Sequence, residues 1–293
     1  MEAIHKIVYG DNQFFGINHR SQDKAEQLAE KFSDVNDILK TYEVAINCGV
    51  DAIMLNSNQK AYEITDFFRK NKSKYGDIAW YPSIPYPHKY ANMLLEKGIF
   101  QTIDEVILKN NSGLSVMKII GSGAWAAINK DAVKMMELLF DAETAMFKGL
   151  DVKVVFIQNV VADLMLGYGM KDVFKAYCDL VRKKYKALPG FITLNLPYML
   201  NKLKEWDVEE VVVCSSINKI GFNMNPSFES YLDAIRQNDS SKYQIMAMST
   251  LASGAIPPKE AFDFVNGLNI QSVVFGASSE RNIRSSLGMI HLK

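Results

Sequence analysis

The chain has few cysteines and histidines, and neither kind is clustered. Its 293 residues include three cysteines, at positions 48, 178 and 214, which are far apart and odd in number. This spacing argues against a disulfide framework and against a paired zinc site, and it is typical of reduced thiols in a cytoplasmic protein. The four histidines, at positions 5, 19, 88 and 291, form no H-x-H or H-E-x-x-H motif. We therefore expect no metal site.

The sequence also lacks net charge and long hydrophobic runs. Lys and Arg together number 33, as do Asp and Glu, so the basic face that nucleic acid requires is not expected. No apolar run approaches the roughly 20 residues of a membrane span, and the opening residues MEAIHKIVYG have no apolar signal core. We expect a small-molecule or phosphorylated ligand as the partner, and neither nucleic acid nor a membrane.

Short apolar stretches alternate with amphipathic ones along the whole chain. Expected strands lie at 7–9, 51–55, 78–84, 152–158, 191–196, 210–218, 243–249 and in the run that ends at Phe275. Expected helices begin at 33 or 34 and at 258, and lie at 130–148, 171–186 and 228–236. About eight such units favour a (β/α)8 TIM barrel, an α/β fold. An open doubly wound sheet is disfavoured because the first turn, GDNQFFG, is not G-x-G-x-x-G.

No linker divides the chain, so we expect one domain over 1–293. Residues 99–129 depart from the alternation, because SVMKII at 115–120 leads into Gly121, Ser122 and Gly123 rather than into a strand loop. We expect a helical excursion there. Its Ile, Val, Met and Trp residues fit either a lid or barrel plug, or a contact surface in a homo-oligomer.

The last strand–helix unit, SVVFGASSERNIRSS, is where we expect an anion to bind. Its apolar run ends at Gly276, and Ser278 or Ser279 occupies the helix N-cap position. Free amides at the helix start, the helix dipole and the side chains of Arg281 and Arg284 all suit a negative ligand. The alternative is an ordinary turn with glycine for backbone freedom and serine for capping.

The expected strand ends are rich in amides and hydroxyls and poor in carboxylates. Paired carboxylates for glycoside hydrolysis are therefore not visible. Amide side chains suit a polar, uncharged substrate, although they also satisfy backbone groups in loops. The candidate substrate-binding residues are Asn12, Asn56, Gln158, Asn195 and Asn218.

Three side chains are candidates for acid–base chemistry. His88, in PYPHKY, has a side chain that titrates near neutral pH. Asp11 could accept a proton or orient a base, and Lys219 could bind an anion or, if desolvated, act as a base or Schiff-base amine. Each has an ordinary alternative: a loop histidine, a turn-stabilising aspartate and a solvated lysine.

The segment IMAMSTLASGAIPPKEAFDFVNGLNIQSVVFGASSERNIRSS resembles the last two strand–helix units of aldo-keto reductases. In that family a Ser-Pro-Leu-like loop precedes a strand reading V-I-x-G-A-S, and AINCGVDAIML resembles its helix and strand before the second loop. The resemblance implies a barrel that binds the phosphate and adenine ribose of NADP in the last loop. The nucleotide-facing positions it implies are Gly276, Ala277, Ser278, Asn282 and Ser286.

The family's catalytic tetrad of Asp, Tyr, Lys and His has no match here. Its F-D-T-A pattern corresponds to residues 53–56, which puts Met54 in place of the aspartate. Tyr62 lies off the family's spacing, and AWYPSIP offers no lysine. The chain therefore resembles a diverged reductase that lacks the usual tetrad.

Three functions stay open at this point. The first is an enzyme that binds a phosphorylated ligand or a nucleotide and uses Asp11, His88 and Lys219. The second is an NADP-dependent oxidoreductase whose proton donor has moved to Tyr86 or His88. The third is a binding or scaffold barrel without catalysis.

Overall fold

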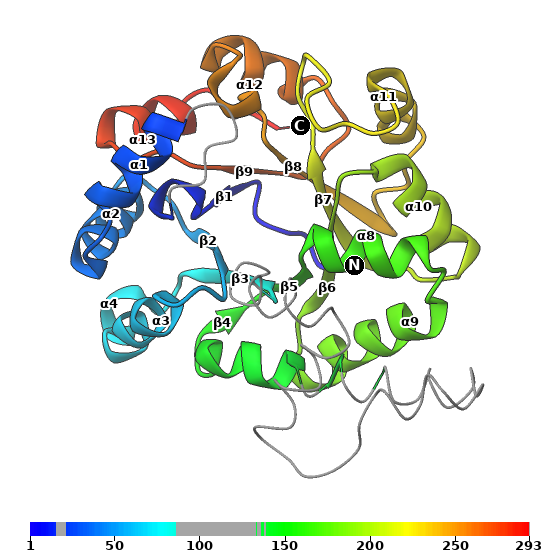
Figure 1. Ribbon diagram of the computed structural model, residues 1–293, viewed down its shortest axis with the longest axis horizontal. Coiled ribbons are helices and arrows are strands. Elements are labelled where there is room, and N and C mark those ends of the chain that lie inside the picture. The colour runs from blue at the N-terminus through cyan, green and yellow to red at the C-terminus, as the bar shows by residue number, and fades with distance from the viewer. Residues whose placement is uncertain (16–21, 86–132, 134–135, 138, 293) are drawn as a thin grey trace.

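The strands form a closed ring in which every pairing is parallel. The computed structural model describes residues 1–15, 22–85, 133, 136–137 and 139–292 (Figure 1). The strands are β1 (Ile7–Tyr9), β2 (Ala52–Asn56), β3 (Ala79–Ile84), β4 (Asp151–Val152), β5 (Val154–Ile157), β6 (Leu188–Thr193), β7 (Val211–Ser216), β8 (Tyr243–Met248) and β9 (Ser272–Phe275). Their order is β2-β1-β9-β8-β7-β6-β5-β3-β4, and an additional pairing of β2 with β3 closes the ring.

The ring has eight strand positions. β4 and β5 are separated by Lys153 alone, and both pair with β3. The nine strands therefore fill eight positions, since two of them share one. The expected (β/α)8 barrel is confirmed.

The helices lie around the outside of this ring (Figure 1). They are α1 (Gln22–Lys31), α2 (Val35–Asn47), α3 (Ala61–Lys70), α4 (Lys72–Tyr75), α8 (Asn159–Gly167), α9 (Lys171–Leu180), α10 (Leu196–Glu205), α11 (Phe228–Arg236), α12 (Pro258–Asn266) and α13 (Glu280–Leu287). A π-helical turn (Val181–Tyr185) extends α9, as the expected helix at 171–186 requires. None of the described helices has the length and apolar character needed to cross a membrane. The expected excursion at 99–129 lies outside the described residues.

Helix α2 illustrates how the sequence signals produce the outer helices. The Asp34 side chain accepts a hydrogen bond from the Asn36 amide (2.9 Å) and caps the helix, as expected. Its buried residues, Ile38, Leu39, Tyr42 and Ala45, recur at helical spacing and pack against the barrel. The capped start and the apolar stripe together place Tyr42 behind the first two strands.

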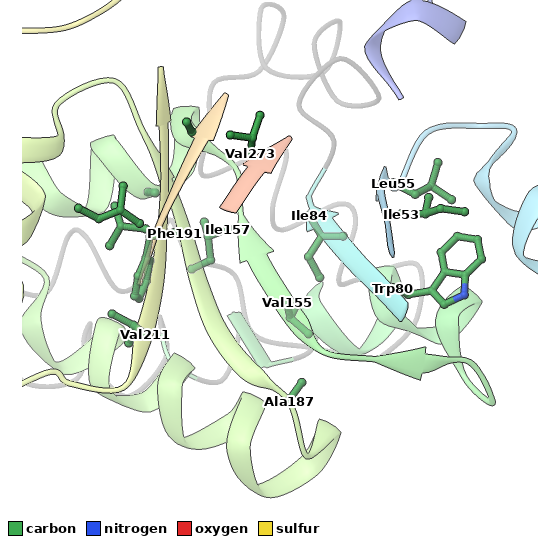
Figure 2. Close-up of a cluster of buried hydrophobic side chains, with 14 of the residues drawn as sticks. Ile53, Leu55, Trp80, Ile84, Val155, Ile157, Ala187, Phe191, Val211 and Val273 are labelled. Atoms are coloured by element: carbon green, nitrogen blue, oxygen red, sulfur yellow. The ribbon is translucent and has the colours of Figure 1, made fainter. Parts of the chain in front are cut away.

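Strand side chains alternate between two apolar layers. Those inside the ring form one buried cluster, which includes Val8, Met54, Tyr81, Phe156 and Cys214. Those on the opposite faces belong to a second cluster that also contains helix residues; Figure 2 labels Ile53, Leu55, Trp80, Ile84, Val155, Ile157, Phe191, Val211 and Val273 from these faces. Burial on both faces explains the continuous apolar runs in the sequence.

Strand β6 lies three residues earlier than expected. The sequence predicts a strand at 191–196, but β6 runs from Leu188 to Thr193, and Asn195 already caps α10. Pro189 and Gly190 read as a turn, yet Gly190 pairs with Val212 inside the ring. A Cβ on Gly190 would lie 2.4 Å from the ring of Phe156, so the position admits only glycine beside that side chain.

The amino-terminal segment covers the other end of the barrel, where the strands begin. The Gln244 side chain accepts from the Ile4 amide (3.0 Å) and donates to the Glu2 carbonyl (2.6 Å). The hydroxyl of Tyr81 is bound by His5, through its backbone amide (3.0 Å) and its ring Nδ1 (2.8 Å). This end of the ring is therefore sealed by side chains, and the open end is the one where the strands finish.

We expect Gly190→Ala to destabilise the barrel by about 1–3 kcal/mol, because the new methyl group overpacks the inner cluster. Its nearest contacts would be the Phe156 ring and Val154 Cγ1, all below 3.0 Å. Gly167→Ala, at the end of α8 with open space around the new Cβ, is the matched control and should change little. Urea unfolding of both variants measures the difference. Equal stability in the two would contradict the packing described here.

Candidate functional site

The carboxyl ends of the strands meet on one face of the barrel, where (β/α)8 enzymes carry their sites. The alternation of the inner cluster directs Asn56, Ser83 and Ser216 into this mouth. All three are buried, and Ser216 Oγ has no hydrogen-bond partner among the residues that the structure describes. Gln158 follows β5 and donates to the Ser83 carbonyl (3.1 Å). These four side chains are polar and uncharged.

The loop after β9 is held in place by the first strand–helix unit. The Gly10 amide donates to the Phe275 carbonyl (2.8 Å), and the Tyr9 hydroxyl donates to the Ala277 carbonyl. Lys31 Nζ donates to the Ser278 carbonyl (2.9 Å). The carbonyls of Phe275, Ala277 and Ser278 are thus engaged, which fixes the backbone between Phe275 and the helix that follows.

The amides of the same loop are free. Ser279 is the N-cap of α13 and accepts from the Asn282 amide (3.4 Å), as the capping pattern predicted. Among the described residues, no acceptor is found for the backbone N–H groups of Ala277, Ser278, Glu280 and Arg281. A fixed turn with free N–H groups at the positive end of a helix dipole is suited to an anion.

The two arginines near this turn differ in whether a carboxylate of the described residues pairs with them. Arg284 is paired with Glu280 through two 2.8 Å contacts, so its charge is largely matched. Arg281 is exposed, and no carboxylate of the described residues pairs with it. Ser286 is buried near the far end of α13, about 9 Å along the axis from Glu280 at 1.5 Å per residue. Of the predicted residues, the structure gathers those up to Asn282 at the turn, and it places Ser286 away from it.

Gly276 is exposed at the start of the turn and has a packing reason for being glycine. A Cβ there would lie 2.2 Å from Gln13 Oε1. The Gln13 amide nitrogen donates to the Gly10 carbonyl (2.7 Å), so the side chain cannot easily withdraw. The glycine thus lets the β1 and β9 loops pack together.

The loop after β8 is strained, which sequence reasoning missed. Ser249, Ala252 and Ser253 have φ values of 54°, 45° and 56°, in the left-handed region that non-glycine residues rarely occupy. Such strain clusters at ligand-binding loops, and β8 is the direct neighbour of β9. The sequence TLASG carries no signal for it, because only the last of these residues is a glycine.

Asp11 lies buried beside the end of β2. Its side chain is 6% exposed, and its Oδ2 accepts from the Asn56 amide (2.8 Å). Burial raises the pKa of Asp11 from 3.8 to about 7, although the hydrogen bond from Asn56 lowers it in part. No described Lys, Arg or His bonds to it. The phenol of Tyr42 lies close enough to feel its charge, is fully buried, and has an unpartnered hydroxyl.

The asparagines after β2 organise their own loop. Asn56 Oδ1 accepts from the amide and side chain of Asn58 (3.1 and 2.8 Å), and Asn58 Oδ1 accepts from the Lys60 amide (2.8 Å). Asn56 is therefore already engaged, whereas Asn12, one residue beyond Asp11, is exposed. The side chain of Asn56 is therefore held in place in the wall of the mouth, whereas Asn12 faces solvent.

Two other predicted amides are structural in this fold. Asn195 caps α10 by accepting from the Tyr198 amide (3.2 Å). Asn218 is fully buried and exchanges two hydrogen bonds with the backbone of Phe222 (2.8 and 2.9 Å). Asn195 and Asn218 stabilise the loops after β6 and β7. The hydrogen bonds named here are made within those loops.

Of the three predicted acid–base residues, the structure describes Asp11 and Lys219. Lys219 is exposed and forms an ion pair with Glu260 (2.9 Å), so the desolvation that a basic amine requires is not present. His88 and Tyr86 lie outside the described residues. Of the three, Asp11 alone is described as a buried group at a strand end.

One further carboxylate on this face was not predicted. Asp163 of α8 accepts from the Thr193 hydroxyl (2.5 Å) and from the Leu194 amide (3.0 Å). Its partial burial raises its pKa, and these two hydrogen bonds oppose the rise. With both contacts directed at the end of β6, Asp163 holds a strand end. Within the described residues, no group of three His, Cys, Asp or Glu side chains could hold a metal ion.

Comparison with known proteins supports the fold. No family model matches the sequence, and no curated protein matches it. Among solved structures, the chain is similar to a Pseudomonas aeruginosa protein assigned as an aldo-keto reductase, with a TM-score of 0.59 and 12% identity over 98% of this chain and 90% of that one. The Bombyx mori aldo-keto reductase in complex with NADP gives a TM-score of 0.56 and 9% identity over 99% and 85%.

A third similar structure is MGS-M4, an aldo-keto reductase from a deep-sea metagenome library of the Medee basin. Its TM-score is 0.55, at 11% identity over 98% of this chain and 85% of that one. At such identities the similarity establishes the architecture: the chain has a parallel barrel of the aldo-keto reductase type. The expected resemblance is confirmed for the fold, and the chemistry has to be argued from this chain's own residues.

We expect Asp11→Asn to gain stability relative to the wild type as pH rises. The folded protein holds the Asp11 proton up to about pH 7, whereas an unfolded chain releases it near 3.8, so wild-type stability falls across that window. The asparagine cannot ionise, and the difference should reach a few kcal/mol above pH 7. Urea unfolding at pH 5 and pH 8 measures it. Asp263→Asn, at an exposed aspartate, is the control; a pH-independent difference for Asp11→Asn would refute the buried carboxyl.

Proposed function

We propose that this protein is an oxidoreductase that binds NADP at the carboxyl face of its barrel and reduces a small carbonyl compound. The observation that carries the proposal is the turn after β9, where free amides of Ala277, Ser278, Glu280 and Arg281 begin a capped helix. A phosphate is the ligand that such a turn suits best. The neighbouring loop after β8 also supports the proposal, because its backbone is strained by residues with positive φ.

The residues at this turn fit a dinucleotide. NADP would bring a hydride donor and phosphate groups of the kind that the β9 turn can hold. Arg281, unpaired among the described residues, would contact a phosphate, and Lys31 already lies at the Ser278 carbonyl. The polar mouth side chains Asn56 and Gln158 would contact the substrate. The NADP complex of the Bombyx mori protein, which has a similar barrel, supports the choice of cofactor.

We expect wild-type protein to bind NADPH saturably and Arg281→Ala to weaken this binding about tenfold, the value of one charge-assisted phosphate contact. Arg284→Ala should cost less, because Glu280 already matches that charge. Arg236→Ala, at an exposed arginine paired with Asp233 on α11, is the matched control and should bind normally. Quenching of protein fluorescence by NADPH measures each affinity. Equal affinities in all four proteins would remove the cofactor from this turn.

Turnover separates a reductase from the other two functions. We expect NADPH absorbance to fall when folded protein is mixed with a panel of small aldehydes and ketones. Saturable NADPH binding with no loss of absorbance would favour a binding or scaffold barrel. Binding of inorganic phosphate or simple phosphate esters without NADPH binding would favour an enzyme that acts on a phosphorylated ligand.

A further inference from the structure

The carboxyl group of Asp11 is buried at the carboxyl end of β1, beside the end of β2. We infer that Asp11 acts as a buried carboxylic acid and gives its proton to the carbonyl oxygen of the substrate. The inference rests on the proposed function, since it names the proton source of that same site. The inference is based on the position of the Asp11 carboxyl, on its burial and on the groups around it.

The position of Asp11 is between the two loops that the proposed function uses. The neighbouring Gly10 amide donates to the Phe275 carbonyl (2.8 Å), which ties the β1 turn to the β9 loop. On the other side, Asp11 Oδ2 accepts from the Asn56 amide (2.8 Å) at the end of β2. A ligand held at the β9 turn and reaching the mouth wall at Asn56 would pass close to this carboxyl.

The surroundings of Asp11 favour its neutral form. Lys31, at the end of α1, and Lys60, at the N-cap of α3, both donate to backbone carbonyls and not to Asp11. Within the described ranges, the titratable groups near it are phenols: Tyr42 of α2, and Tyr9 of β1 next to Tyr42. Burial raises the pKa of both phenols above their ordinary value, so neither supplies charge at neutral pH. Hydrogen bonds from the backbone and side chain of Asn56 and from the amide of Asp11 itself favour the carboxylate, but burial outweighs them and raises the pKa to about 7.

Several other described candidates for a proton donor are engaged elsewhere. Met54 stands at the inward position of β2 where the resemblance would place an aspartate. Tyr81, its partner on β3, points its hydroxyl to His5 at the closed end of the barrel. Lys219 is exposed and paired with Glu260, and Asp163 holds the end of β6. Among these described groups, Asp11 is the one we assign as the acid.

The step balances as a two-electron reduction of a carbonyl. The carbonyl carbon accepts a hydride from the reduced nicotinamide, and its oxygen accepts the proton of the Asp11 carboxylic acid. The product is an alcohol, and Asp11 is left as a carboxylate that regains a proton from water. A general acid works best when its pKa is close to the working pH, which a buried aspartate at about 7 satisfies and an exposed one does not.

The test compares wild-type protein with Asp11→Asn, and uses Asp163→Asn as the matched control on the same face. Infrared difference spectra across pH 5–9 should show a carboxylic acid band that disappears near pH 7 in the wild type and is missing in Asp11→Asn. Carbonyl reduction should fall about 100-fold or more in Asp11→Asn, with NADPH affinity changed by less than about threefold. The wild-type rate should decline above pH 7, as should that of Asp163→Asn.

The outcomes separate this inference from the proposed function. If wild-type protein binds no NADPH or reduces no carbonyl compound, the proposed function fails, and this proton donor fails with it. If NADPH binds and reduction proceeds, but Asp11→Asn keeps its rate and its decline above pH 7, the inference alone is overturned. The same holds if the carboxylic acid band persists in Asp11→Asn. Loss of rate in Asp11→Asn with unchanged NADPH affinity supports both.

Discussion

The pairing of the first strand with the last is the contact on which the rest of this structure depends. Ile7, Val8 and Tyr9 lie in register with Val273, Val274 and Phe275, and this pairing joins the two ends of the chain within the closed ring. Closure removes both sheet edges and buries both strand faces. It also joins the first loop to the last, so that the Tyr9 hydroxyl reaches the Ala277 carbonyl 268 residues away. The candidate site exists because of this closure.

Desolvation is the second constraint, and it acts on the same corner of the barrel. The described groups around Asp11 are phenols and amides, and the nearby lysines are used by backbone carbonyls. A carboxyl without a cation in such a place keeps its proton into the neutral range. The exposed Lys219–Glu260 pair on the β7 loop is the opposite case, since water stabilises both charges there. Burial, and not residue type, separates these two predicted acid–base groups.

The barrel fold restricts the amino-acid sequence less than a chemical reaction does. A parallel barrel needs short apolar strands, capped amphipathic helices and small residues at a few crowded points such as Gly190. Many sequences satisfy these demands, which is why solved barrels at 9–12% identity share this architecture. A reaction needs particular side chains at particular strand ends, and these are not transferred with the architecture. The structural resemblance therefore establishes the architecture, and the chemistry has to be argued from residues such as Asp11 and those of the β9 turn.

The sequence by itself determined the elements and most of their bounds, because hydrophobic periodicity and capping are local properties. The caps Asp34 and Ser279 were each predicted to within one residue in this way, and the β6 bounds were wrong because Pro189 and Gly190 resemble a turn. The tertiary structure alone decided which loops touch, the exposure of Lys219 and the isolation of the Asp11 carboxyl. Those properties depend on distances between residues far apart in the chain, which no local pattern encodes.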